Sequence, residues 1–227
     1  MLIPKIIHQI WSGIDEPLPA HFEKLGNTWK QNHPEWQYEF WNNRRMNDFV
    51  QVHYPQYWKA YCEFPYNIQR WDAIRYLILY KTGGLYADFD YESLKPIEKI
   101  VEKKTCCFPL EPSFGKLSFN NALMLAIPEH PFMKTIIEHV FSEKNLSTPP
   151  LPRGDCVMQT TGPCMLRDLY LQLSPVEKES VFLIPARYVT PLNWHQVQMY
   201  RKGATGRYEL FLKEAYAIHY FYGTWWE

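Results

Sequence analysis

The chain has 227 residues, of which 46% are hydrophobic and 17% aromatic, so it can bury a sizeable core in one large domain. Its 24 basic and 24 acidic residues cancel to a formal charge of zero. This balance offers no excess of positive charge to a polyanion, and we expect no nucleic-acid partner.

The N-terminal stretch MLIPKIIHQIW has neither the long apolar run nor the cleavage site of a signal peptide. No apolar run approaches the ~20 residues of a membrane-spanning helix. The five cysteines show no metal-ligand spacing and are typical of a reducing compartment. We therefore expect a cytoplasmic location, with peripheral attachment to the inner face of the membrane as an alternative.

The first 61 residues alternate between strand and helix patterns. The Ile-rich stretch 3–11 predicts a buried strand, and apolar residues at helical spacing predict a helix over 20–32. Residues 36–42 alternate like a second strand, and 43–61 predict one or two helices interrupted near Pro55. Strand, helix, strand is the opening of an alternating α/β fold.

The next pattern joins a very apolar helix to a strand. Residues 67–82 predict the helix, with Asn67 as its N-cap and Gly83 as its C-cap. The stretch GLYADFD, 84–90, then predicts a strand that ends at two aspartates.

The rest of the chain carries weaker patterns and no internal repeat. In chain order we predict a strand near Cys106, a strand at 121–127, a helix over 131–141, a surface loop at 147–155, a short helix after TTGP, and strands at 181–185 and 216–221.

Asp88 and Asp90 form the first candidate site. Residues two apart on a strand point to the same side, and ligands of open α/β sheets bind beyond the carboxyl ends of strands. Two carboxylates this close repel each other, which a divalent cation would relieve, and hard oxygen ligands favour Mg²⁺ or Mn²⁺. The alternative for this pattern taken alone is a solvated turn.

Asp72 and Arg75 lie three residues apart on one face of the predicted helix, with Tyr76 beside them. They can be a local surface ion pair, which stabilises a fold little. They can also be functional, with a carboxylate for hydroxyl groups and a guanidinium for a phosphate or a sugar.

Four stretches, in order IPKIIHQIW, RWDAIRYLILYKTGGLYADFD, NNALMLAIPEHPF and TTGP, resemble glycosyltransferase family 32, which includes yeast-type α-mannosyltransferases and bacterial capsule enzymes. The central stretch also resembles the catalytic domain of the large clostridial glucosylating toxins. The resemblance implies a single GT-A-type α/β domain over 1–227, with a mixed, mostly parallel sheet flanked by helices. It further implies a Rossmann-like nucleotide-sugar half, 1–125, and an acceptor-side half, 126–227.

The resemblance also assigns roles to residues. It implies catalytic roles for Asp88, Asp90 and Arg75, with Asp90 as a direct metal ligand and Asp88 partly bound through water. It implies that the donor is bound by Trp11, Asp72, Arg75, Tyr86, Asn121 and Trp225. His219 would complete the metal site, with Thr224 as the alternative ligand. A core tryptophan and a hydrogen-bonded core histidine are the plain alternatives for Trp11 and His219.

The resulting hypothesis is a hexosyltransferase that uses Mn²⁺ or Mg²⁺ and a UDP- or GDP-sugar donor. The acceptor would be a glycan or a lipid-linked saccharide, capsule polysaccharide being the commonest bacterial setting, and transfer would retain the anomeric configuration. The alternatives are a non-catalytic carbohydrate-binding module, suggested by the aromatic residues, and a metal-dependent phosphohydrolase, for which the sequence shows no further ligand cluster.

Overall fold

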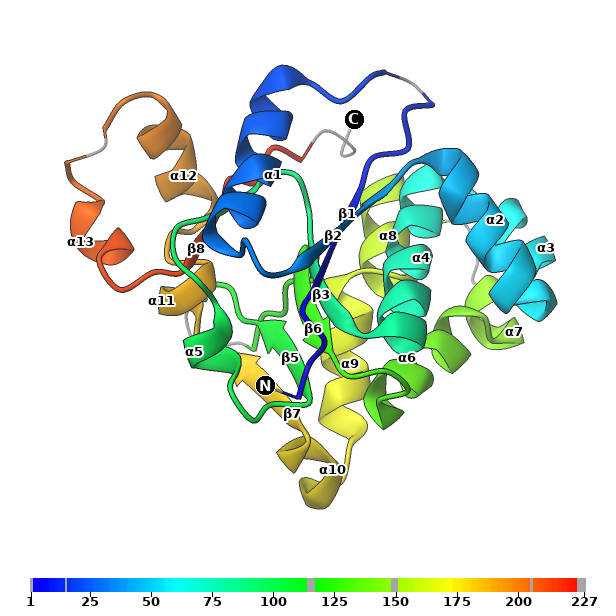
Figure 1. Cartoon of the computed structure of the whole chain (residues 1–227). Helices are drawn as coiled ribbons and strands as arrows, with labels where there is room; N and C mark the ends of the chain where they lie inside the picture. The colour runs from blue at the N-terminus through cyan, green and yellow to red at the C-terminus, as the bar shows by residue number, and fades with distance from the viewer. Residues whose placement is uncertain (1, 15, 114–116, 148–150, 205, 224–227) are drawn as a thin grey trace.

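A six-stranded sheet in the order β2-β1-β3-β6-β5-β7 forms the centre of the computed structural model, which describes residues 2–14, 16–113, 117–147, 151–204 and 206–223 (Figure 1). The strands are β1 (Ile6–Ile10), β2 (Gln37–Trp41), β3 (Gly84–Ala87), β5 (Cys106–Pro109), β6 (Leu123–Ala126) and β7 (Val181–Ile184). β1 pairs in parallel with β2 and β3, and β5 with β7, whereas β6 runs antiparallel to β3 and β5. The predicted mixed, mostly parallel sheet is therefore correct.

Helices cover both faces of this sheet, as Figure 1 shows, with α4 and α6 on one side and α1 and α5 on the other. The helices are α1 (Ala20–Asn32), α2 (Asn43–His53), the 3₁₀ turn η1 (Pro55–Tyr57), α3 (Trp58–Glu63), α4 (Asn67–Thr82), α5 (Glu98–Val101), α6 (Pro131–Val140), α7 (Glu143–Leu146), α8 (Arg153–Thr160), α9 (Pro163–Gln172), α10 (Pro175–Glu179), α11 (Ala186–Val189), α12 (Trp194–Arg201) and α13 (Glu209–Leu212). A second, two-stranded sheet pairs β4 (Tyr91–Ser93) with β8 (Ala217–His219) in antiparallel fashion. No helix in the described ranges is long and apolar enough to cross a membrane.

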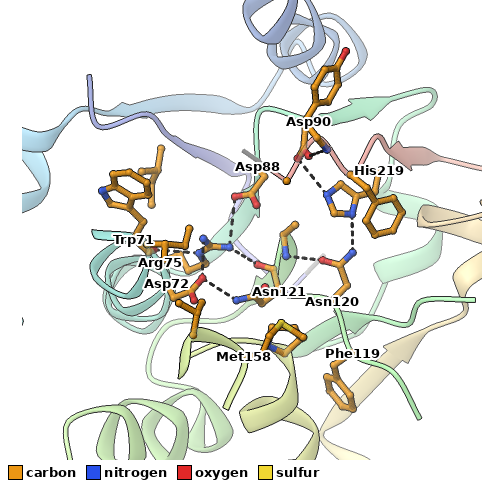
Figure 2. A pocket seen from close by; sticks show the side chains of 18 of the residues that line it. Trp71, Asp72, Arg75, Asp88, Asp90, Phe119, Asn120, Asn121, Met158 and His219 are labelled. Atoms are coloured by element: carbon orange, nitrogen blue, oxygen red, sulfur yellow. Dashed lines mark hydrogen bonds and ion pairs between the residues drawn. The ribbon is translucent and has the colours of Figure 1, made fainter. Parts of the chain in front are cut away.

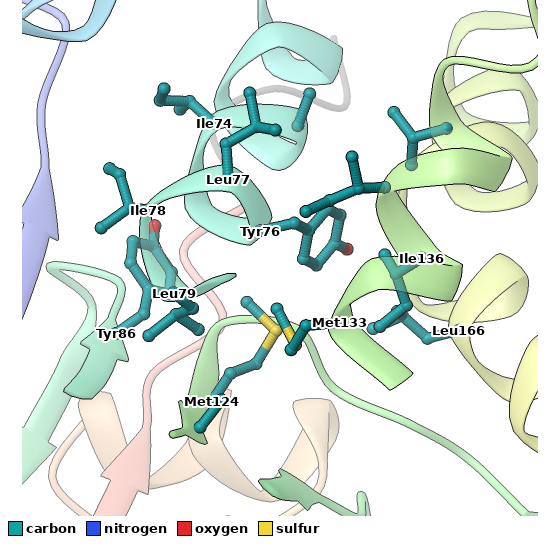
Figure 3. Close-up of a cluster of buried hydrophobic side chains, with 14 of the residues drawn as sticks. Ile74, Tyr76, Leu77, Ile78, Leu79, Tyr86, Met124, Met133, Ile136 and Leu166 are labelled. Carbon is teal, nitrogen blue, oxygen red and sulfur yellow. The ribbon is translucent and has the colours of Figure 1, made fainter. Parts of the chain in front are cut away.

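Side chains of the central strands alternate between two hydrophobic cores. Tyr86 and Met124 pack into the core that contains α4 and α6 (Figure 3). Leu85 and Leu125 point the other way, into the core that contains Trp29 of α1. Because both faces are covered, these strands read as continuous apolar runs without the alternation of a half-exposed strand.

The double glycine sets the passage from α4 into β3. Gly83 and Gly84 have φ angles of 65° and 105°, which side chains disfavour. A Cβ on Gly84 would also lie 2.6 Å from the carbonyl oxygen of Ile6 in β1, and one on Gly83 would lie 2.7 Å from Cδ of Pro128. Gly83 is the C-cap, as predicted, whereas the predicted N-cap Asn67 is wrong.

Among the predicted boundaries that differ from the structure, three have a clear physical cause. Tyr66 is the N-cap of α4, because the side chain of Gln69 accepts its backbone N–H at 3.2 Å. β3 ends at Ala87, short of the predicted 84–90, because the backbone N–H of Tyr91 donates to the carbonyl of Asp88 at 3.0 Å and closes a turn. The end of the predicted loop 147–155 belongs to α8, since its last proline precedes the helix and does not interrupt it.

The proposed division at residue 125 falls within β6, and β7 from the second half belongs to the same central sheet. Both halves thus share one sheet. Their assignment to the donor and the acceptor stays a prediction.

Candidate active site

A cavity of about 570 Å³ opens at one edge of the central sheet. This edge holds the carboxyl ends of β1 and β3 and, because β6 runs the opposite way, the residues that precede β6. The sheet therefore collects side chains from segments far apart in the sequence. All predicted site residues of the described ranges line the cavity: Trp11, Asp72, Arg75, Tyr86, Asp88, Asp90, Asn121 and His219. Trp225 and Thr224 lie outside the described residues.

Arg75 contacts both the aspartate of its own helix and the first aspartate of the pair (Figure 2). Its side chain is 4% exposed, and its guanidinium lies 2.9 Å from Oδ1 of Asp72 and 3.5 Å from Oδ1 of Asp88. It also donates to the backbone carbonyls of Trp71 at 3.1 Å and Asn121 at 2.9 Å. Burial alone would lower the pKa of Arg75, but the surrounding acidic groups raise it. The guanidinium therefore stays charged and ties α4 to the turn that carries Asp88. The surface ion pair considered above is excluded.

Asp72 is also buried and has three polar partners. Its carboxylate accepts hydrogen bonds from the Thr161 hydroxyl at 2.8 Å and from the Asn121 amide at 3.0 Å, besides the contact with Arg75. Burial nevertheless raises the pKa of Asp72 to about 6, although Arg75 works in the opposite direction. Three partners thus engage this carboxylate, and its side chain is 4% exposed.

Asp88 leaves the end of β3 and faces the cavity. Its Oδ1 accepts a hydrogen bond from the buried Tyr86 hydroxyl and lies near Arg75. Burial raises the pKa of Asp88, Arg75 opposes the rise, and the nearby Asp90 carboxylate adds to it. The Arg75 guanidinium lies over the Tyr86 ring, with Cζ 4.8 Å from the ring centre. This cation–π contact further stabilises the charge of Arg75.

Asp90 is anchored from the other side, by the C-terminal segment. Its Oδ1 lies 3.2 Å from Nε2 of His219, and its Oδ2 accepts the backbone N–H of Tyr222 at 3.0 Å. Burial would raise the pKa of Asp90, but His219 and the Tyr222 N–H outweigh it and lower the pKa. Asp90 is consequently the more readily ionised member of the aspartate pair.

His219, the last residue of β8, stacks on Tyr91 with ring centres 4.6 Å apart and an interplanar angle of 3°. Burial lowers its pKa, but Asp90 outweighs burial and the pKa is raised. Nδ1 lies 3.0 Å from the amide nitrogen of Asn120, and a proton on Nδ1 would point at this donor. Asp90 thus favours the doubly protonated, cationic ring of His219, whereas the Asn120 amide nitrogen disfavours a proton on Nδ1.

The aspartate pair fits a divalent cation. Both carboxylates are hard ligands that line one cavity, and their mutual repulsion would be relieved by a positive ion. Within the described ranges, no group of three or more His, Cys, Asp or Glu side chains could hold a metal ion. A cation here would take its remaining ligands from water and from a bound ligand, which is usual for Mg²⁺. A metal-binding role for His219 stays a prediction.

Trp11 lies just after β1 and is half-buried. Its ring packs near Phe22, at 5.6 Å between ring centres, and its Nε1 donates to the carbonyl of Glu16 at 2.9 Å. The ring also lines the cavity. An anchored, partly exposed indole can stack on a planar ligand, so the structure leaves the predicted nucleobase contact available.

Among the polar residues that the sequence analysis missed are Asn120 and Glu111, which line the cavity, and Thr161, which donates to Asp72. Thr161 belongs to the TTGP stretch and Asn120 to NNALMLAIPEHPF, so both lie in stretches that carried the resemblance. Glu111 follows β5 and lines the cavity, and burial raises the pKa of its carboxyl. No local pattern marks Glu111.

Residues 19–107 match the sequence profile described as a glycosyltransferase sugar-binding region containing a DXD motif. The chain is 29% identical over 209 residues to inositol phosphoceramide mannosyltransferase 1 of Schizosaccharomyces pombe, which covers 85% of this chain and 62% of the relative. It is also 29% identical over 172 residues to the mannosyl phosphorylinositol ceramide synthase SUR1 of Saccharomyces cerevisiae, covering 75% of this chain and 42% of that protein. The chain thus spans about two fifths to three fifths of the length of these relatives.

Among solved structures, the UDP-bound glycosyltransferase domain of the YGT toxin superposes with a TM-score of 0.58 at 9% identity, over 81% of this chain and 80% of that domain. At this identity the similarity concerns the fold alone, and it confirms the predicted GT-A architecture. The predicted resemblance to glycosyltransferases with an Asp-x-Asp motif is confirmed, and Asp88 and Asp90 form the Asp-x-Asp pair within the matched residues.

Proposed function

We propose that this chain, whose residues 19–107 form a glycosyltransferase sugar-binding region, transfers a hexosyl group from a nucleotide sugar to a hydroxyl group of a glycan or lipid-linked saccharide. The observation that carries the proposal is the meeting of Asp88 and Asp90 with the buried Asp72–Arg75 pair in one cavity at the carboxyl edge of the sheet. Such a site offers separate groups for a diphosphate and for sugar hydroxyls.

The donor would lie across this edge. Trp11 would stack on the base, Asp72 and Asn121 would bind sugar hydroxyls, and the Arg75 guanidinium would fix the sugar or its phosphate. Asp88 and Asp90 would hold Mn²⁺ or Mg²⁺, which when bound neutralises the charge that grows on the departing diphosphate. The contacts of Arg75 with Asp72 and Asp88 would hold these groups in place before the donor binds, so that they need not rearrange during the reaction.

A mannosyl donor and a phosphoinositol-containing lipid acceptor are favoured by the names of the two yeast relatives. Both UDP- and GDP-sugars fit the proposal. The cavity offers aromatic surface around Trp11, on which either a uracil or a guanine ring can stack. Capsule assembly is a second setting. Location in the cytoplasm or peripherally on the inner face of the membrane is proposed on the sequence features alone.

We also propose that transfer retains the anomeric configuration, with the departing phosphate accepting the proton of the acceptor hydroxyl. Support comes from the site, where Asp72, Asp88 and Asp90 are already engaged by cationic or hydrogen-bonding partners. Two further carboxylates among the described residues line the cavity, Glu16 and Glu111, and the less exposed Glu111 is the candidate for a base. NMR of the first-formed product decides, because an α-linked donor that gives a β-linked product would show inversion.

The test of the function is a screen of UDP- and GDP-hexoses with and without Mn²⁺. We expect one donor to raise the melting temperature, since binding to the folded state stabilises it, and to be consumed only when a saccharide acceptor is present. Phosphate release from simple esters would support the phosphohydrolase instead. Glycan binding without consumption of any donor would support the carbohydrate-binding module.

A further inference from the structure

The helices α12 and α13, with the residues that flank them, form a small lobe at one side of the molecule (Figure 1). Its own core contains Val197 of α12 together with Tyr208 and Leu212, at the start and the end of α13. Since Tyr208 and Leu212 are four positions apart, they share one face of this helical turn. Leu210 and Phe211 lie between them and point outward, with 82% and 50% of their surface exposed.

Exposed apolar side chains are concentrated on this α12–α13 lobe. Among the described residues, eleven large hydrophobic side chains are exposed, and four of them belong to the two helices: Trp194, Met199, Leu210 and Phe211. These helices have only eight and four residues, so apolar exposure is far denser here than on the rest of the chain. Single exposed apolar side chains are ordinary, whereas a local concentration of them marks an interaction surface.

Positive charge gathers on the same lobe. The exposed basic side chains are Arg201, Lys202, Arg207 and Lys213. They outnumber the two acidic side chains of the lobe, Glu209 and Glu214. The whole chain has 24 basic and 24 acidic residues, so its neutral total conceals a locally positive surface beside the apolar one. A surface of this kind is complementary to an anionic one.

We propose that the α12–α13 lobe docks on the surface of an anionic lipid membrane. Leu210 and Phe211 enter the boundary between headgroups and acyl chains, and the basic side chains face the lipid phosphates. A protein partner fits the surface less well, because lysine is depleted at protein–protein interfaces. Stable protein interfaces also take roughly 20–30 residues from each partner, far more than the exposed apolar side chains of these two short helices.

The lobe borders the cavity. Trp194, the first residue of α12, lines the cavity. At the other end of α12, the Arg201 guanidinium lies 3.6 Å from the ring centre of Tyr222, which also lines the cavity. A docked lobe therefore brings the cavity close to the bilayer, where a lipid-linked acceptor is found. This consequence rests on the proposed function, whereas the docking itself does not.

Sedimentation of the full chain with lipid vesicles, with neither donor nor cation present, tests the docking. We expect binding to phosphatidylcholine vesicles that contain phosphatidylserine, weaker binding to phosphatidylcholine alone, and loss of the difference at high salt, which screens the charges. The pair Leu210→Gln and Phe211→Gln should weaken binding at least about tenfold, because the apolar insertion is lost. The pair Lys202→Gln and Arg207→Gln should weaken it roughly 20-fold on the anionic vesicles.

The pair Leu171→Gln and Val176→Gln is the matched control. These side chains are 55% and 76% exposed, and they lie on α9 and α10, outside the lobe. All the substituted side chains are on the surface, so each variant should keep the wild-type melting temperature, and the control should keep wild-type vesicle binding.

Three results would overturn the proposal. The first is wild-type chain that stays in the supernatant with phosphatidylserine vesicles. The second is binding that Leu210→Gln and Phe211→Gln leave unchanged or that the control pair weakens equally. The third is a dimer in size-exclusion chromatography that the Leu210 and Phe211 pair dissociates, which would assign the surface to a second copy of the chain. None of these results bears on sugar transfer, which the donor screen tests separately.

Discussion

Replacing Arg75 with methionine should cost the fold about 3–5 kcal/mol, because the change leaves the buried Asp72 carboxylate, and the partly exposed Asp88 carboxylate, without their cation. The structure sets this magnitude: the side chain is 4% exposed and lies 2.9 Å from Asp72 and 3.5 Å from Asp88. Its loss also removes the donors to the carbonyls of Trp71 and Asn121. For a chain of this size the melting temperature should fall by roughly 6–20 °C.

Urea denaturation followed by circular dichroism measures the free energy of unfolding for this variant and its control. Arg167→Met is the matched control, since Arg167 lies 2.8 Å from Asp168 but the two side chains are 37% and 56% exposed. An exposed pair contributes about 0–1 kcal/mol. If Arg75→Met lost no more stability than Arg167→Met, the buried network would not hold the site together. Should Arg75→Met fail to fold, Arg75→Lys keeps the charge without the planar fork and should lose less stability but most of the activity.

Four further predictions concern single residues. Asp90→Asn should abolish transfer while leaving the melting temperature within a few degrees of wild type; activity that persists in the variant with EDTA would contradict the metal site. Trp11→Ala should raise the donor KM far more than it lowers the melting temperature, whereas a large stability loss with unchanged KM would make Trp11 a core residue. Glu111→Gln should keep kcat within about tenfold if no protein base is needed, because a lost general base typically costs 10²–10⁴-fold; a loss in that range together with a β-linked product would assign Glu111 as the base. Burial lowers the pKa of His8 from 6.5 to about 4, so the folded chain keeps this ring neutral. The free energy of unfolding should therefore be unaffected by His8 above pH 6.5 and should fall by up to about 3 kcal/mol as the pH drops towards 4, because only the unfolded chain takes up the proton readily. The stability difference between wild type and His8→Gln, from urea midpoints at pH 7 and 4.5, should shrink accordingly, and an unchanged difference would rule out this titration.

The sequence predicted the central elements correctly where residues close in the chain showed a clear helical period or a required glycine. α1 begins and ends at the predicted residues 20 and 32, because its apolar spacing and the charged residues around it leave few alternatives. The double glycine marked the end of α4, since both residues need φ angles that other side chains disfavour. One boundary failed where a local turn competed with the strand: at Ala87, the turn from Asp88 to Tyr91 ends β3 early.

The predicted site residues were brought together because strands of one direction deliver their carboxyl ends to one edge. Trp11 and Asp88 lie just beyond β1 and β3, whereas the pattern placed them within the C-terminal ends of the predicted strands 3–11 and 84–90. What the pattern could not indicate is that β6 enters the sheet in reverse between β3 and β5. This reversal carries Asn120 and Asn121 to the same edge.

The sequence by itself determined the α/β alternation, the glycine turn and the aspartate pair, because each depends on residues a few positions apart that obey a helical or strand period. Only the tertiary structure decided how these groups are paired. Asp72 meets Thr161 across 89 positions, and Asn120 meets His219 across 99. No period relates residues so distant, and these hydrogen bonds form because burial removes water, so that each polar atom must find its partners within the protein.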